Sequence, residues 1–304
     1  MGNSSKMFKV ETLRPLPEAI AGTMMAELPS GDILVTGGNG WENDRKFWSN
    51  RSHLYSVNEK TWRAGPLLPK SLGNALCVKA ANQWIIFGGA NENGVNDSVF
   101  LLSVENAPAW KNVGTTPFCL VHGAAAADGT RIYFVGGTPS ATVATVGLKQ
   151  LWLGKADPCG LIQWQPGPDF PGQAVSIMSA ALWQRKFFVF GGYTEQGCNT
   201  DQAFSYDLKG GWKPLAPLPY ASRASTVIAM ENGIVIIGGW IDKEAIPHVW
   251  FYQPETNQYE QLSELPVGIA VASGLYSKSA IYLAGNEDRI KHRSPNAFRL
   301  HFGE

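Results

Sequence analysis

The sequence predicts an all-β protein, a six-bladed β-propeller with four antiparallel strands in each blade. Three observations carry this prediction. A run of β-branched and aromatic residues ends in glycine six times, an aromatic residue followed by a proline recurs after the first five runs, and the start of the chain resembles the end of a repeat. A fixed period of about fifty residues indicates a repeat architecture.

The glycine-ending runs come first in each repeat. Residues 33–38, 84–89, 132–137, 187–192 and 234–239 end in Gly-Gly, and residues 281–286 end in Gly-Asn. Strands of this composition suit a buried sheet. Glycine at their ends allows the backbone to turn sharply and to approach neighbouring chains closely.

The second landmark completes the repeat. Trp62, Trp110, Trp164, Trp212 and Tyr259 are followed by Pro69, Pro117, Pro171, Pro219 and Pro266, respectively. Another short strand, such as residues 53–57 or 249–252, lies between each glycine pair and its aromatic residue. Each unit therefore has four strands, and we expect the aromatic side chains to fill the space between neighbouring blades.

This pattern resembles the kelch motif over nearly the whole chain. Residues 252–259 (Tyr-Gln-Pro-Glu-Thr-Asn-Gln-Tyr) are especially similar to that family's turn between the third and fourth strands. The resemblance implies a single kelch-type propeller domain over residues 1–304. The blades are predicted at about 18–69, 70–117, 118–171, 172–219, 220–266, and 267–304 together with 7–17.

The last blade borrows a strand from the start of the chain. After residue 267 there is room for only three strands, at about 269–276, 280–285 and 296–302. Residues 8–17 (Phe-Lys-Val-Glu-Thr-Leu-Arg-Pro-Leu-Pro) match the aromatic strand and its Leu-Pro ending. We therefore predict that residues 7–13 complete the last blade and close the ring.

Composition excludes several classes of function. The chain has 25 Lys and Arg against 25 Asp and Glu, which gives no electrostatic footprint for nucleic acid or an anionic membrane. No apolar stretch approaches 18 residues, so no transmembrane helix is expected. The first residues show no apolar signal region, so we expect a cytoplasmic protein; the alternative is a periplasmic protein from which an export signal has been removed.

The cysteines indicate neither a disulfide framework nor a zinc site. Cys77, Cys119, Cys159 and Cys198 lie far apart and form no CxxC pair. We expect no metal site and no cofactor.

The loop after the sixth glycine-ending run differs from the others. Residues 285–298 place three basic residues and a histidine between two strands, beside the only copy that lacks the second glycine. A local break in a repeat pattern often marks a functional site. The alternative interpretation is a solvated charged loop.

The same loop resembles the N-acetylneuraminate epimerase (sialic acid mutarotase) family, in its circularly permuted branch. The resemblance lies in Glu287, in Arg293 six residues later and in the following Ser294, with support from residues 37–41, 46–48, 68–73 and 166–171. It implies that Glu287 is the catalytic acid and base, that Arg293 binds the substrate carboxylate and that the partner is a small sugar acid such as sialic acid. Asn286, where that family usually has a second glycine, and Lys291-His292, where a glycine is common, depart from the pattern.

Further substrate-binding candidates follow from position in the repeat. Ligand sites of propellers lie at the mouth of the central channel, in loops that leave the inner strands. Asn39, Asn91 and Arg223 are expected near this mouth or just below it, and His122 and Trp41 are additional options. Each has a structural alternative. Arg223 would form an ion pair at a strand end, His122 would be a satisfied polar group beneath a loop, and Trp41 would pack as part of a lid.

Three other functions are alternatives to the isomerase. A non-catalytic kelch propeller that binds carbohydrate or protein is the main alternative. A copper oxidase would need a tyrosine, a cysteine and two histidines to converge, but the five histidines lie in distant loops. A sialidase would carry Asp-box turns, and residues 56–62, which come nearest to that pattern, lack its Asp and Gly.

Overall fold

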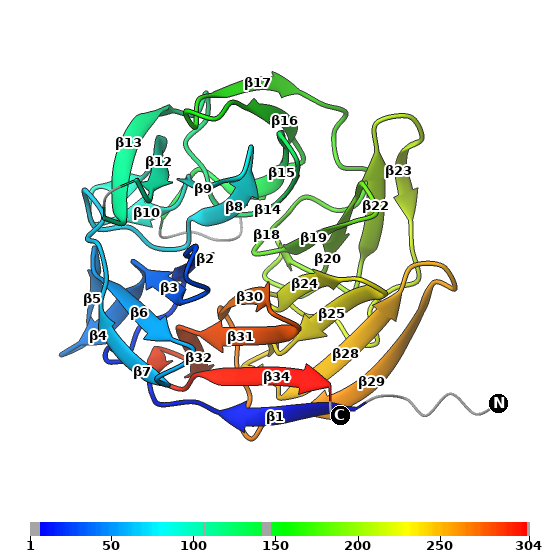
Figure 1. The fold of residues 1–304 in the computed structure, drawn as a ribbon. Helices are drawn as coiled ribbons and strands as arrows, with labels where there is room; N and C mark the ends of the chain where they lie inside the picture. Colours follow the sequence, from blue (N-terminus) through cyan, green and yellow to red (C-terminus); the bar gives the residue numbers. More distant parts are fainter. Residues whose placement is uncertain (1–6, 106, 142–146, 303–304) are drawn as a thin grey trace.

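A computed structural model describes residues 7–105, 107–141 and 147–302. Residues 1–6 and 303–304 of the predicted 1–304 domain lie outside the described residues. Six four-stranded antiparallel sheets stand around a ring, with β2, β8, β14, β19, β24 and β30 innermost (Figure 1). This arrangement confirms the predicted six-bladed, all-β propeller. No helix in the described ranges is long and apolar enough to cross a membrane.

The first three blades follow one another along the chain. Blade 1 contains β2 (Met24–Glu27), β3 (Ile33–Thr36), β6 (Ser52–Ser56) and β7 (Thr61–Ala64). Blade 2 contains β8 (Leu76–Ala80), β9 (Gln83–Phe87), β12 (Ser98–Ser103) and β13 (Ala109–Thr115). Blade 3 contains β14 (Val121–Asp128), β15 (Arg131–Thr138), β16 (Leu151–Ala156) and β17 (Ile162–Pro166).

The other three blades complete the ring. Blade 4 contains β19 (Ser179–Trp183), β20 (Lys186–Phe190), β22 (Ala203–Asp207) and β23 (Gly211–Pro214). Blade 5 contains β24 (Thr226–Met230), β25 (Gly233–Ile237), β28 (His248–Gln253) and β29 (Gln258–Glu264). Blade 6 contains β30 (Ser273–Ser277), β31 (Ala280–Ala284), β34 (Phe298–Phe302) and β1 (Phe8–Thr12).

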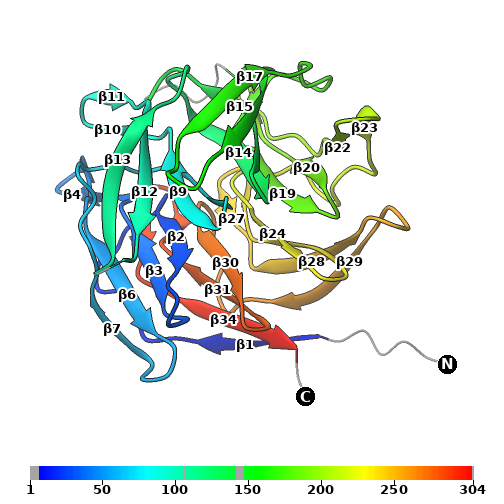
Figure 2. The same ribbon diagram turned by 45° about the horizontal axis from the view of Figure 1, so that its top comes forward.

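The N-terminal strand closes blade 6, as predicted. β1 pairs antiparallel with β34 from Phe8 opposite Phe302 to Thr12 opposite Phe298. The Phe8 and Phe302 rings stack with centroids 4.4 Å apart. Both views show β1 alongside β34 at the outer edge of the blade (Figures 1 and 2).

The hydrophobic core lies between blades. Each of the core clusters in the described residues joins side chains from two neighbouring sheets, as where Met24 and Leu34 of blade 1 pack with Ile86 and Phe100 of blade 2. A four-stranded sheet cannot bury both faces alone, so this packing around the ring supplies the main stabilisation.

The repeated aromatic residue forms a hydrogen bond to the preceding blade in blades 1, 4 and 5, through Trp62, Trp212 and Tyr259, whereas Trp110 Nε1 and Trp164 Nε1 have no partner among the described residues. Trp62 Nε1 donates to the Arg14 carbonyl at 2.7 Å, and Trp212 Nε1 donates to the Pro168 carbonyl at 3.0 Å. Both acceptors lie in the Pro-rich segment that follows the fourth strand of the preceding blade. The spacing of aromatic residue and proline in the sequence therefore reflects a contact between blades.

The glycine pairs adopt backbone conformations that other residues avoid. Gly37 and Gly38 have φ angles of 65° and 106°, and a Cβ atom on Gly37 would lie 2.4 Å from the Leu72 carbonyl oxygen. In blade 6, Gly285 keeps this conformation with φ of 66°, while Asn286 is fully buried and donates from Nδ2 to the Asn296 carbonyl at 2.8 Å.

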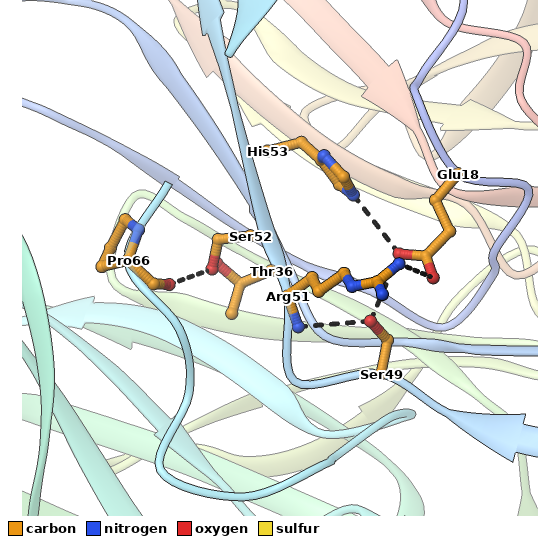
Figure 3. A network of polar contacts seen from close by, with 7 residues as sticks. All are labelled: Glu18, Thr36, Ser49, Arg51, Ser52, His53 and Pro66. Carbon is orange, nitrogen blue, oxygen red and sulfur yellow. Dashed lines mark hydrogen bonds and ion pairs between the residues drawn. The ribbon is translucent and has the colours of Figure 1, made fainter. Parts of the chain in front are cut away.

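A polar network fixes the segment that enters blade 1 (Figure 3). One Glu18 carboxylate oxygen lies 3.3 Å from Ser49 Oγ and 3.3 Å from His53 Nε2. The other lies 3.5 Å from Arg51 Nη1. The contact with His53 is the largest cause that lowers the pKa of Glu18. The network holds the connection between β5 (Arg45–Trp48) and β6 against the segment around Glu18, which leads into blade 1.

Candidate functional site on the hairpin face

Short hairpins project from one face of the ring, which we call the hairpin face. They are β4 (Asn39–Glu42) with β5, β10 (Ala90–Asn91) with β11 (Gly94–Val95), β26 (Trp240–Ile241) with β27 (Glu244–Ala245), and β32 (Asn286–Arg289) with β33 (His292–Ser294). Each follows the second strand of its blade. Asn39 forms a backbone bridge with Ala21, and Glu287 forms one with Ala270. Asn39 and Glu287 therefore occupy equivalent positions in blades 1 and 6.

Glu287 and Arg293 form an ion pair on this face. They stand opposite each other across β32 and β33, and Glu287 Oε1 contacts Arg293 Nη1. The Arg293 side chain is only 8% exposed and that of Glu287 15% exposed. Residues directly opposite in a hairpin project to the same side. The six-residue spacing in the sequence therefore becomes a direct contact through the turn between the two strands.

Asn39 of the neighbouring blade completes the contacts of the guanidinium. Arg293 Nη2 donates to Asn39 Oδ1 at 2.7 Å, and Arg293 Nε donates to the Asn39 carbonyl at 3.3 Å. Burial lowers the pKa of Arg293 to about 10, so the side chain stays charged at neutral pH. The site therefore spans the junction where the last blade meets the first.

The β4–β5 hairpin brings two aromatic rings and a lysine to the same side. Asn39 is paired with Trp48 and Trp41 with Lys46, and alternation along the strands turns all four side chains to one face. Lys46 Nζ lies 4.2 Å from the Trp48 ring centroid. Lys291, from the turn between β32 and β33, places Nζ 5.0 Å from the Trp41 ring centroid, and the buried Trp41 Nε1 has no partner in the described part of the chain.

We call Asn39, Trp41, Lys46, Trp48, Glu287, Lys291 and Arg293 the Arg293 cluster. It contains three cationic side chains and one carboxylate. Asp288 in the same hairpin does not change this balance, because it contacts Arg289 and His292 of its own turn. The cluster therefore favours an anionic ligand.

His122 is electrostatically linked to the cluster. It is the second residue of β14, has a φ angle of 60° and is half-buried. Burial, with a smaller effect from the charge of Lys46, lowers the pKa of His122 to about 4. The imidazole is therefore neutral at physiological pH.

Asn91 and Arg223 make their contacts elsewhere on the hairpin face. Asn91 donates to the Ser71 carbonyl at 3.1 Å and accepts from the Asn93 amide at 2.9 Å, which closes its own loop. Arg223 donates to Asn199 Oδ1 and, at 3.3 Å, to the Asp242 carbonyl, while its guanidinium lies 4.5 Å from the Tyr193 ring centroid. Neither residue has a contact with Glu287 or Arg293 among the described residues.

Sequence reasoning missed Lys46 as a site residue. The alternating pattern of residues 39–48 carried a signal, since Asn39, Trp41, Lys46 and Trp48 share a face if residues 43–44 form a two-residue turn. Both Asn43 and Asp44 have positive φ angles, 48° and 59°, as such a turn requires.

Fold and site together define a six-bladed propeller with a polar cluster on one face of its ring. Residues 77–286 match the profile of the KLHDC2/KLHL20/DRC7 Kelch-repeats domain, so the chain belongs to the kelch-repeat family. The match agrees with the kelch resemblance predicted from the repeats.

Kelch-like protein 35 and two scruins are similar to part of this chain. Kelch-like protein 35 of Mus musculus is 23% identical over 127 residues, which are 41% of this chain and 21% of that protein. Alpha-scruin of Limulus polyphemus is 27% identical over 128 residues, 38% of this chain and 14% of that protein. Beta-scruin of the same organism is 26% identical over 125 residues, with the same two shares. The matched region thus spans about a fifth or less of each relative.

Proposed function

We propose that this kelch propeller is a binding module and that the Arg293 cluster receives a carboxylate-bearing ligand. One observation carries the proposal: two adjoining hairpins bring together three cations, Lys46, Lys291 and Arg293, with one carboxylate, Glu287, which is paired with the largely buried Arg293. A cation withdrawn from water without a counter-ion is costly, so an anionic ligand is stabilised there. The matches to kelch-repeat proteins, whose names denote no enzyme, support a binding role.

The binding role is tested by isothermal titration calorimetry with N-acetylneuraminate and with its methyl ester, which lacks the negative charge. A hydrogen bond to a charged group contributes roughly 1.5–3 kcal/mol, so we expect the acid to bind about tenfold to a hundredfold more tightly than the ester. Lys243→Gln, in the turn of the β26–β27 hairpin, is the control and should bind as the wild type does. Equal affinity for acid and ester, or no binding of either, contradicts a carboxylate ligand of this kind.

A second candidate is anomer interconversion of N-acetylneuraminate, as the resemblance of the 285–294 segment implies. The observation that favours it is the Glu287 carboxylate, 15% exposed and next to a guanidinium. Ring opening takes a proton from the anomeric hydroxyl and delivers one to the ring oxygen. A carboxylate near both oxygens would transfer that proton and accelerate exchange by roughly 10² to 10⁴.

Proton NMR of freshly released α-N-acetylneuraminate separates this candidate from simple binding. An isomerase accelerates the appearance of the β anomer, and Glu287→Gln reduces the rate to the spontaneous one while the protein stays folded. If the wild-type protein leaves the exchange rate unchanged, the isomerase candidate is excluded and the binding module is retained.

A further inference from the structure

The Arg293 guanidinium is already occupied by groups of the protein. Nη1 contacts Glu287, Nη2 donates to Asn39 Oδ1 and Nε donates to the Asn39 carbonyl. A bidentate arginine–carboxylate contact needs two parallel N–H donors on one edge of the guanidinium. Nη1 makes no hydrogen bond with a described residue, but it is buried against Glu287, and the Arg293 side chain is only 8% exposed, so a ligand carboxylate has little access to the guanidinium.

Lys46 is in the opposite situation. Its ammonium lies on the Trp48 ring, and it makes no hydrogen bond or ion pair with any described residue. Burial, followed by the charge of Arg293, lowers the pKa of Lys46 to about 8, so most molecules carry the cation at pH 7. This half-buried cation has no counter-ion within residues 7–105, 107–141 and 147–302, although its ammonium can donate three hydrogen bonds.

Lys46 is the half-buried cation of the cluster that forms no ion pair with a described residue, whereas Lys291 is exposed. Arg293 and Glu287 of β32–β33 are paired with each other, and His122 of β14 is neutral at pH 7. Lys291 covers Trp41, whose unpartnered Nε1 is a further donor. An anion beside Lys46 would therefore meet donors and no unpaired carboxylate.

We propose that Lys46 receives the carboxylate of the ligand and that Arg293 is a positioning residue that holds Asn39 and Glu287. This inference rests on the proposed binding function and adds the residue that recognises the charge. The class of ligand is a small carboxylic acid with an adjacent polar group, since Trp41 Nε1 lies on the same face of the hairpin.

The test compares the affinities for N-acetylneuraminate and its methyl ester in three variants at pH 7. We expect Lys46→Gln to lose the preference for the acid, a change of about tenfold or more in the ratio of the two Kd values, while the ester still binds. Lys46→Arg should keep the preference. Lys79→Gln is the matched control, because Lys79 also lies over a tryptophan ring, 5.6 Å from the centroid of Trp84, in blade 2.

A pH profile adds a readout that a structural defect would not reproduce. Lys46 is a cation below its pKa of about 8 and becomes neutral above it, so the wild-type Kd for the acid should rise about tenfold between pH 7 and pH 9. Arginine stays charged over this range, so Lys46→Arg should show a flat profile.

The outcomes separate the two proposals. If Lys46→Gln keeps the wild-type preference for the acid, or if the wild-type profile is flat up to pH 9, the assignment of Lys46 is wrong and the binding module is unaffected. If the wild-type protein binds neither compound, the proposed function and the role of Lys46 are both overturned.

Discussion

Breaking the ion pair between Glu287 and Arg293 should destabilise the ring at the junction of blades 6 and 1. Arg293→Met leaves the Glu287 carboxylate, 15% exposed, without its cation and removes both hydrogen bonds to Asn39. Removal of one partner of a buried pair costs about 3–5 kcal/mol. Because both side chains keep some contact with water, we expect a loss of about 3 kcal/mol in the free energy of unfolding.

Urea unfolding of a double-mutant cycle measures this effect. Glu287→Gln and Arg293→Met should each destabilise the protein, and the double variant should lose about 2 kcal/mol less than the two losses combined, since neither charge is then left alone. Arg289→Met is the control. It removes an ion pair with Asp288 from the same hairpin, but its side chain is 73% exposed, so the cost should stay below about 1 kcal/mol. Strictly additive losses, or an Arg293→Met effect as small as the control, would refute the reasoning.

Three further predictions concern acid stability and ring closure. His122 has a pKa of about 4 in the folded state against 6.5 for the free side chain, so the unfolded chain binds its proton first. The free energy of unfolding of the wild type should fall by about 3 kcal/mol as pH falls from 6.5 to 4. Urea unfolding of His122→Phe should not show this decrease. The pKa of Glu18 is lowered by His53, so its contribution is present above pH 4.5 and is lost as pH falls below that value; Glu18→Gln should show a shallower decline of stability in acid. Phe8 is 5% exposed and stacks on Phe302, so Phe8→Ala should lower unfolding stability by about 3 kcal/mol, and thermal melting that matches the wild type would argue against β1 as a structural part of blade 6.

The architecture could be predicted from the sequence because the same backbone and hydrogen-bonding requirements recur in successive repeats. Gly37 and its counterparts need positive φ angles, and Trp62 needs a carbonyl partner in the preceding blade, so both landmarks mark fixed points of the blade. The closing strand was predictable for the same reason: Phe8 begins a segment with the pattern of a fourth strand, and the last repeat lacks one. The predicted range 7–13 differs from the observed Phe8–Thr12 by one residue at each end.

The composition of the site followed from the sequence only in part. Glu287 and Arg293 meet because both lie in one hairpin, where register converts spacing into contact. Asn39 reaches them from 248 to 254 residues away, a neighbour relation that only ring closure creates. Arg223 and Asn91 occupy the expected face, but local acceptors, the Asn199 amide oxygen and the Ser71 carbonyl, take up their donors. Side-chain direction at a loop depends on such local partners, which a repeat pattern does not encode.

A groove of about 440 Å³ lies on the β4–β5 hairpin, but on the face opposite Trp41 and Lys46, where it is lined by Glu42, Asn43, Arg45 and Phe47. Grooves of about 530 Å³ and 410 Å³ lie on either side of strands β16 and β17 and share Lys155 and Gln163 in their walls. A ligand selected by size alone would bind in the groove of about 530 Å³ on the outer part of blade 3. A ligand selected by charge should instead bind at the junction of blades 6 and 1.

A crystal structure of the protein with N-acetylneuraminate at pH 7 tests the central claim most directly. We predict electron density for the ligand between the β4–β5 and β32–β33 hairpins, with its carboxylate within hydrogen-bond distance of Lys46 Nζ and the contacts between Arg293, Glu287 and Asn39 unchanged. Ligand density confined to the grooves beside β16 and β17, or a carboxylate that displaces Glu287 from Arg293, would contradict the account.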